Sequence, residues 1–185
     1  MRFDPAHSAV EKKPAHATKS DSLQFDQSSE ETTVTATQQT LIIMKPDAVQ
    51  RALAGAILSR FEAKGLRIAA LKCLHIDRPL AERHYAVHQG KPFYEGLVQF
   101  ITSGPVVVGV LEGPNAIEAT RNLMGATNPV TAAPGSIRGE FALEIGQNLV
   151  HGSDAPETAE YEIGLYFKPE EIVSYRRDVD RWVAE

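Results

Sequence analysis

The pattern of apolar and polar positions changes abruptly near residue 40. Before that point the chain is rich in Ser, Thr, Gln, Lys and Glu and shows no sustained hydrophobic period. Such a segment cannot bury enough apolar surface to offset the entropy that it loses on ordering. We therefore predict a disordered tail over residues 1–38 and one folded domain over residues 39–185.

Four apolar runs in the second region predict β-strands. Most are rich in β-branched residues, and they are bounded by Gly, Pro or Asp, as strands commonly are. They cover residues 40–44, 66–76, 105–111 and 148–150. Pro46 ends the first run, and proline is well suited to the first turn of a helix.

Helical spacing of apolar residues appears between these runs. Ile57, Leu58 and Phe61 recur at helical intervals, and Gly65 follows as a stop signal. The remaining helices are predicted over residues 81–88, 93–101, 115–124 and 158–166. Asn115 is expected to cap the helix that follows it.

Residues 125–135 contain two prolines and show no period, so they predict a long loop. Loops of this length inside a compact domain are usually functional. The complete order of elements is close to the split βαβ arrangement of ferredoxin-like folds. We predict a single α+β domain with a four-stranded antiparallel sheet and its helices on one face.

Composition narrows the possible functions. The formal net charge of -5 gives the chain no general attraction for nucleic acid or anionic membranes, so any phosphate must be held by a few well-placed cations. No apolar run is long enough to span a membrane. Cys73 is the single cysteine and cannot form an internal disulfide, which favours a reducing compartment and a cytoplasmic location. Its apolar neighbours predict a core or half-buried position.

The segment around His151 carries the strongest chemical signal. A short apolar run ends in His151, Gly, Ser153 and Asp154, and Glu162 follows eleven residues after the histidine in a predicted helix. A carboxylate there could accept a hydrogen bond from one ring nitrogen and leave the other free to attack. Taken alone, such a histidine is more often a surface loop residue. The chain contains no glycine-rich phosphate loop.

Six segments, in order along the chain, together resemble the nucleoside diphosphate kinase family over residues 40–185. They are Ile42–Asp47, Lys91–Tyr94, Thr102–Val107, Gly125–Pro129, Gly135–Gly139 and Asn148–Asp154. The resemblance implies transfer of the γ-phosphate of ATP to nucleoside diphosphates by a ping-pong mechanism. It implies that His151 becomes a phosphohistidine, that Glu162 orients it and that Ser153 lies beside the pair. Without the resemblance, Ser153 would be interpreted as an N-cap or turn residue.

The resemblance also implies a nucleotide site. Its members would be Lys45, Arg121, Arg138 and Thr127 on the phosphates, Asn148 near the ribose, Phe93 stacked on the base and Tyr85 lining the pocket. Without the resemblance, the lysine would be a solvated surface residue, the arginines surface ion pairs and the phenylalanine a core residue. Mg²⁺ is the implied cofactor, with Asp154 holding its waters.

A homohexamer is the implied assembly, with a homotetramer as the alternative. Trp182, in a polar C-terminal segment, is consistent with packing on another surface. A catalytically silent regulatory module that binds nucleotides on the same fold is the alternative function. Nucleic-acid binding as a primary role is disfavoured by the net charge.

Overall fold

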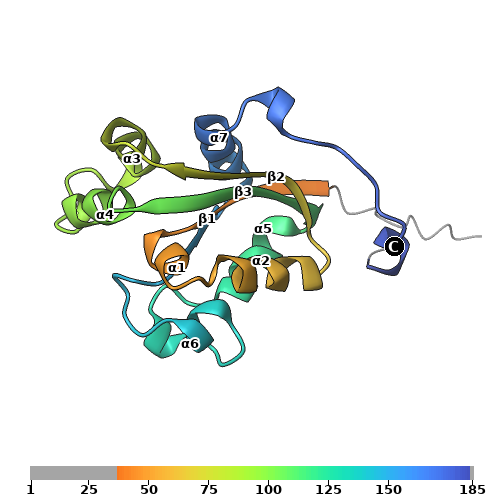
Figure 1. Ribbon diagram of the computed structural model, residues 1–185, viewed down its shortest axis with the longest axis horizontal. Helices are drawn as coiled ribbons and strands as arrows, with labels where there is room; N and C mark the ends of the chain where they lie inside the picture. The colour runs from red at the N-terminus through yellow and green to blue at the C-terminus, as the bar shows by residue number, and fades with distance from the viewer. Residues whose placement is uncertain (1–36, 184–185) are drawn as a thin grey trace, which may run out of the picture. The chain divides into compact units, whose positions relative to one another are not determined.

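The computed structural model describes residues 37–183 (Figure 1). The predicted tail over residues 1–38 therefore lies almost entirely outside the described residues. Strand β1 (Thr37–Met44) begins two residues before the predicted start of the domain at residue 39. Within the described residues, no helix is both long and apolar enough to cross a membrane.

The sheet has four strands, all paired antiparallel in the order β2-β3-β1-β4. The other three strands are β2 (Arg67–His75), β3 (Pro105–Pro114) and β4 (Val150–Gly152). This order confirms the predicted ferredoxin-like sheet. The fourth strand starts two residues later than predicted, so His151 lies in the middle of a strand and not at its end.

The helices occupy the predicted regions and add one that was not predicted. They are α1 (Pro46–Gln50), α2 (Ala54–Ala63), α3 (Arg78–His84), α4 (Tyr94–Ile101), α5 (Ala116–Met124), α6 (Ile137–Phe141) and α7 (Pro156–Tyr166). Short 3₁₀ turns cover Ala86–His88, Pro129–Thr131, Pro169–Glu171 and Asp180–Trp182. Pro46 opens α1 as expected, whereas α6 was missed because its five residues are too few to show a period.

Helices cover both faces of the sheet, so the prediction of one covered face is wrong. Helices α3, α4 and α7 lie on one side of the sheet in Figure 1, and α1, α2, α5 and α6 lie on the other. Central strand β1 feeds both cores: Leu41 and Ile43 pack into the first, Ile42 and Met44 into the second. Its unbroken apolar run is the signature of a strand buried on both faces.

Two local predictions are also wrong. Cys73 is exposed on edge strand β2, and so is Leu71 two residues earlier, which is 46% exposed and points to the same face. Asn115 has a left-handed backbone (φ 49°), and its side chain makes no capping hydrogen bond to α5.

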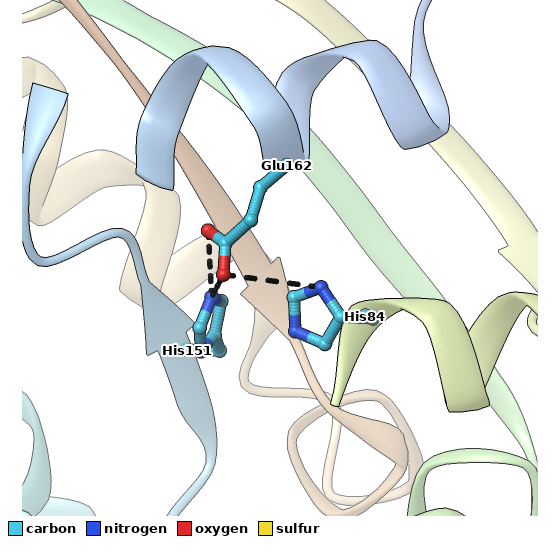
Figure 2. Close-up of side chains that lie close together, drawn as sticks. All are labelled: His84, His151 and Glu162. Atoms are coloured by element: carbon cyan, nitrogen blue, oxygen red, sulfur yellow. Dashed lines mark hydrogen bonds and ion pairs between the residues drawn. The ribbon is translucent and has the colours of Figure 1, made fainter. Parts of the chain in front are cut away.

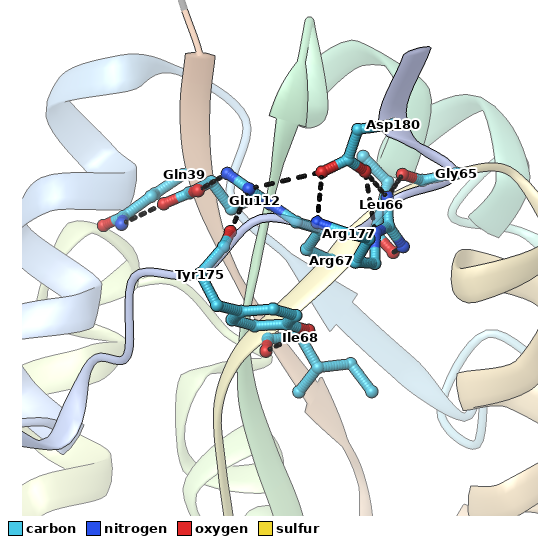
Figure 3. A network of polar contacts seen from close by, with 9 residues as sticks. All are labelled: Gln39, Gly65, Leu66, Arg67, Ile68, Glu112, Tyr175, Arg177 and Asp180. Carbon is cyan, nitrogen blue, oxygen red and sulfur yellow. Dashed lines mark hydrogen bonds and ion pairs between the residues drawn. The ribbon is translucent and has the colours of Figure 1, made fainter. Parts of the chain in front are cut away.

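The C-terminal segment is fastened across the start of β2 by a polar network (Figure 3). Arg67 donates to the Glu112 carboxylate on β3 and to the Tyr175 carbonyl, and it lies 3.6 Å from the Asp180 carboxylate. Gln39 on β1 completes the network with a hydrogen bond of 2.8 Å to Glu112. Arg67 therefore connects three strands to residues 175–180.

A second group of contacts secures the same segment. Arg177 donates to the carbonyls of Gly65 at 2.6 Å and Leu66 at 3.3 Å, and the Tyr175 hydroxyl donates to the Ile68 carbonyl at 3.2 Å. These backbone acceptors lie at the start of β2, so the segment follows the edge strand.

Replacing Arg67 with Ala should lower the free energy of unfolding by about 1–3 kcal/mol, because a half-buried hydrogen-bonded charge is lost. Chemical denaturation measures the loss, and limited proteolysis should cut residues 173–183 faster. Arg78→Ala is the matched control, since Arg78 forms two ion pairs of 2.8 Å that are exposed to solvent. Equal losses in the two variants would contradict this interpretation of the Arg67 network.

Candidate active site

The register of β4 on β1 directs the His151 side chain. His151 pairs with Ile43, and residues directly paired across antiparallel strands point to the same face of the sheet. Ile43 belongs to the core beneath α3, α4 and α7. The imidazole therefore faces α3 and α7 and keeps 24% of its side-chain surface exposed (Figure 2).

Glu162 of α7 meets the imidazole, a contact that the eleven-residue spacing allowed and the family resemblance implied. His151 Nε2 lies 3.0 Å from each carboxylate oxygen of Glu162, which is only 5% exposed (Figure 2). Among the described residues, none forms a hydrogen bond with Nδ1. The arrangement places the proton on Nε2 and leaves the Nδ1 lone pair directed away from the carboxylate.

Ser153 joins this pair to the central strand. Its hydroxyl donates to the second carboxylate oxygen of Glu162 at 2.6 Å and accepts the Leu41 amide at 3.2 Å. The Ser153 amide in turn donates to the Leu41 carbonyl at 3.2 Å. Because Ala155 occupies the N-cap of α7, the interpretation of Ser153 as an N-cap is wrong.

Burial and hydrogen bonding act in opposite directions on the Glu162 carboxyl group. Burial raises its pKa, but hydrogen bonds from His151 and Ser153, together with the nearby His84, bring the pKa below its ordinary value. Glu162 is therefore a carboxylate at neutral pH and can hold an imidazole N–H.

His84 is part of the site and was missed by sequence reasoning. Its ring lies edge-on to His151, with centroids 4.6 Å apart, and its Nδ1 is 3.9 Å from Glu162 Oε1 (Figure 2). Neither ring nitrogen has a hydrogen-bond partner in the part of the chain that the structure describes. Burial, followed by His151, lowers the pKa of His84 to about 3, so this ring is neutral. Helical spacing from buried Ala81 would have placed His84 on the inner face of α3, but not beside Glu162.

Lys45 and Asn148 form a second group at the other end of β4. The Lys45 ammonium donates to the Asn148 side-chain oxygen, and the Asn148 amide donates to the Thr127 carbonyl at 2.8 Å. Lys45 is 8% exposed, so its interpretation as a solvated surface residue is wrong. Burial lowers its pKa to about 8, with Asp47 opposing and Arg138 adding to that shift.

The two arginines converge on the backbone of the same segment. Arg138 donates to the carbonyls of Gly125 at 2.8 Å, Val150 at 2.7 Å and Asn148 at 3.3 Å. It is buried and forms no ion pair within residues 37–183, so the interpretation as a surface ion pair is wrong for Arg138. Burial and the neighbouring charge of Arg121 lower its pKa to about 10.

Arg121, on α5, is exposed and donates to the Gly152 carbonyl at 3.3 Å. Gly152 lets α5 come this close to β4, since a Cβ there would lie 2.7 Å from the Met124 sulfur and 3.2 Å from the Thr120 methyl. The glycine after the histidine is therefore required for close packing and not for a special backbone conformation. Two guanidinium groups held so near each other favour an anion between them.

Aromatic rings lead from the histidine pair to the surface. Tyr85 is buried 4.7 Å from the His84 ring, and it stacks with His88 at 6.2 Å. The His88 ring is 5.6 Å from Phe93, which is 52% exposed, so the interpretation of Phe93 as a core residue is wrong. Asp154 and Thr127 are also exposed.

Comparison with known proteins identifies one family. The family model described as "Nucleoside diphosphate kinase" matches residues 38–172. The chain is 64% identical to the nucleoside diphosphate kinase of Thermomicrobium roseum over 146 residues, which are 79% of this chain and 98% of that protein. It is 59% identical to the one from Roseiflexus castenholzii over 148 residues, which are 80% of this chain and 99% of that protein.

Solved structures give the same result. The structure of a halophilic nucleoside diphosphate kinase from Halobacterium salinarum in complex with CDP matches with a TM-score of 0.79 at 48% identity, covering 81% of this chain and 100% of that one. A nucleoside diphosphate kinase family protein from Babesia bovis matches with a TM-score of 0.76 at 45% identity, covering 79% of this chain and 99% of that one.

The buried neutral His84 predicts a specific acid sensitivity. Below pH 6.5 the unfolded chain binds a proton at this residue, which the folded state does not accept until about pH 3. As the pH falls from 6.5 towards 3, the free energy of unfolding should therefore decrease by about 1.4 kcal/mol per pH unit because of this one residue. His84→Phe, which cannot titrate, should show a pH slope shallower by that amount in urea denaturation between pH 4.5 and 6. Parallel slopes for the two proteins would show that His84 titrates normally.

Proposed function

The chain belongs to the nucleoside diphosphate kinase family and transfers a phosphate from a nucleoside triphosphate to a nucleoside diphosphate, and we propose that His151 carries that phosphate. The observation that supports this role is the pair of 3.0 Å contacts between His151 Nε2 and the Glu162 carboxylate. These contacts hold the ring with Nδ1 available as the nucleophile.

The first half-reaction follows from this geometry. The Nδ1 lone pair attacks the γ-phosphorus of ATP, the bond from that phosphorus to the bridging oxygen breaks, and ADP leaves with the electron pair. The imidazole becomes cationic as the bond forms. Glu162 stabilises that charge through the Nε2 proton, and Ser153 keeps the carboxylate in place.

The second half-reaction reverses the first with another nucleotide. A terminal phosphate oxygen of a nucleoside diphosphate attacks the phosphorus of the phosphohistidine, and the electron pair returns to Nδ1. Donor and acceptor occupy the same pocket in turn, which gives ping-pong kinetics.

Cations around β4 stabilise the charge of the transferring group. We assign Lys45, Arg121 and Arg138 to the phosphates, because all three contact residues 148–152 beside the imidazole. The Thr127 hydroxyl would add a phosphate contact. Since phosphoryl transfer depends mainly on position and electrostatics, these side chains take the place of a glycine-rich loop.

The nucleoside would lie along the aromatic row. Phe93 is half exposed and presents a ring on which a base can stack, with Tyr85 forming the inner wall. Stacking accepts every base because each has a π face. Asn148, bonded to Lys45, is suitably placed for a ribose hydroxyl. The halobacterial structure was solved with CDP, which supports binding of this ligand class here.

Mg²⁺ fits this site as a nucleotide-bound ion. Asp154 is an exposed carboxylate that follows Ser153, and Mg²⁺ typically combines one or two carboxylates with phosphate oxygens and water. We propose that Asp154 holds waters of that ion. When bound, Mg²⁺ neutralises charge on the β- and γ-phosphates.

A homohexamer is the proposed assembly, with a homotetramer as the alternative. Large apolar side chains remain exposed, and Val130, Leu143 and Trp182 are each at least 80% exposed. Strand β2 lies at an edge of the sheet, and edge strands are templates for association. A cytoplasmic location is proposed as well, because an exposed free Cys73 suits a reducing compartment; cell fractionation tests it.

Multi-angle light scattering should give a mass close to six chains. A mass of four chains would support the alternative assembly, and a monomer at micromolar concentration would refute both. Leu143→Glu or Val130→Glu should shift the mass toward smaller species if these side chains lie at subunit contacts.

Phosphate transfer is tested with ATP labelled on the γ-phosphate. The wild type should acquire an acid-labile label, and His151→Ala should acquire none and lose exchange activity at least about a thousandfold with several diphosphate acceptors. His75→Gln is the matched control, since His75 is exposed on β2 outside the site, and it should retain the label. A wild-type protein that binds nucleotide but takes up no label would favour the silent regulatory module.

A further inference from the structure

A strained turn separates the two halves of the site. Leu149 is completely buried and has a φ of 68°, a backbone conformation that is unfavourable for a branched apolar residue. The Val150 amide donates to the Asn148 carbonyl at 2.8 Å across it. A three-residue turn with positive φ at its centre is rare and strained.

Two contacts from the segment Lys45–Asp47 hold this turn. The Leu149 amide donates to Asp47 Oδ2 at 3.0 Å, and the Leu149 carbonyl accepts the Lys45 amide at 2.8 Å. Both polar groups of the strained residue are thus bound by the segment that follows β1. Strain persists where surrounding structure over-determines it, and it clusters at functional sites.

The turn sets the positions of groups on both sides. Before it, Asn148 offers its side chain to Lys45 and its carbonyl to Arg138 at 3.3 Å. After it, the chain enters β4 and places His151 opposite Ile43. A relaxed backbone at Leu149 would rotate one group relative to the other.

We propose that Asp47 is a positioning residue of the phosphate site, holding the strained Leu149 turn so that Lys45 and Asn148 are placed correctly relative to His151. The proposal rests on the proposed function of this site. Asp47 does not itself contact the phosphate in this scheme; it acts through the turn and through Lys45.

A buried charge supports the same role. Asp47 is 9% exposed, and its Oδ1 has no hydrogen-bond partner among the described residues. An incompletely bonded buried carboxylate is poor for stability, so it indicates an electrostatic task. The charged groups that face the Lys45 ammonium are Asp47 and Arg138, with neutral His84 nearby. Asp47 alone raises the pKa of Lys45, and so keeps it protonated.

Asp47→Asn separates charge from hydrogen bonding. Its amide oxygen can still accept the Leu149 amide, so the fold should survive. Without the carboxylate, Lys45 should lose its proton at a lower pH, and the alkaline limb of kcat/KM for nucleoside diphosphate should move down by about one pH unit.

Asp47→Ala also removes the oxygen that accepts the Leu149 amide hydrogen bond. It should lower kcat by about tenfold to a hundredfold and accelerate amide hydrogen exchange in residues 148–151.

Two controls match these variants. Asp178→Asn removes the same charge from an exposed position, and it should leave the pH profile unchanged. Ile57→Val loses buried apolar volume at α2, in the same core as Leu149, but it changes none of the polar contacts of the turn; it should lower the melting temperature while kcat, KM and the alkaline limb stay at wild-type values.

The outcomes distinguish the two proposals. A wild type that exchanges no phosphate refutes the proposed function itself. An active wild type whose alkaline limb is unmoved in Asp47→Asn refutes the role of Asp47, and so does an Asp47→Ala protein with wild-type hydrogen exchange in residues 148–151. Loss of kcat in Asp47→Ala no greater than in Ile57→Val would also refute it.

Discussion

The site depends on three residue pairs that join β4 to β1. This pairing places His151 over the core beneath α7, and it makes the backbone on either side available to cations. Arg138 and Arg121 both donate to carbonyls of this segment, and Lys45 contacts it through its backbone and its side chain. The proposed phosphate site is thereby arranged around one short edge strand, and the chain has no glycine-rich loop.

Positive charge is concentrated at that strand, although the chain as a whole has a net charge of -5. Lys45 and Arg138 are both nearly buried, and burial lowers the pKa of each. Buried cations without equal numbers of carboxylates are unfavourable until an anion arrives. In the proposed site a polyphosphate would supply that anion, so the cost of burying the cations would favour nucleotide binding. Glu162 is bonded to His151 and Ser153, so its charge is directed at the proposed nucleophile.

Sequence patterns identified most of the elements because local periodicity controls them. The unbroken apolar run in β1 predicts the position of the strand and also indicates burial on both faces, which is inconsistent with helices on one face only. In β2, a similar run belongs to an edge strand, and Cys73 is exposed. The two runs look alike locally, and only the strand order separates a central strand from an edge strand.

The sheet and a possible contact between His151 and Glu162 could be predicted from the residues, and the six ordered segments indicated the family. The first two follow from short-range periods and from a spacing of eleven residues between adjacent elements. Three features follow only from the tertiary packing: which imidazole nitrogen is held, the place of His84 beside the pair, and the bond from Leu149 to Asp47. That last bond spans 102 residues, and the bond between Lys45 and Asn148 spans 103. Contacts so distant in sequence arise from packing of whole elements, and no local pattern encodes them.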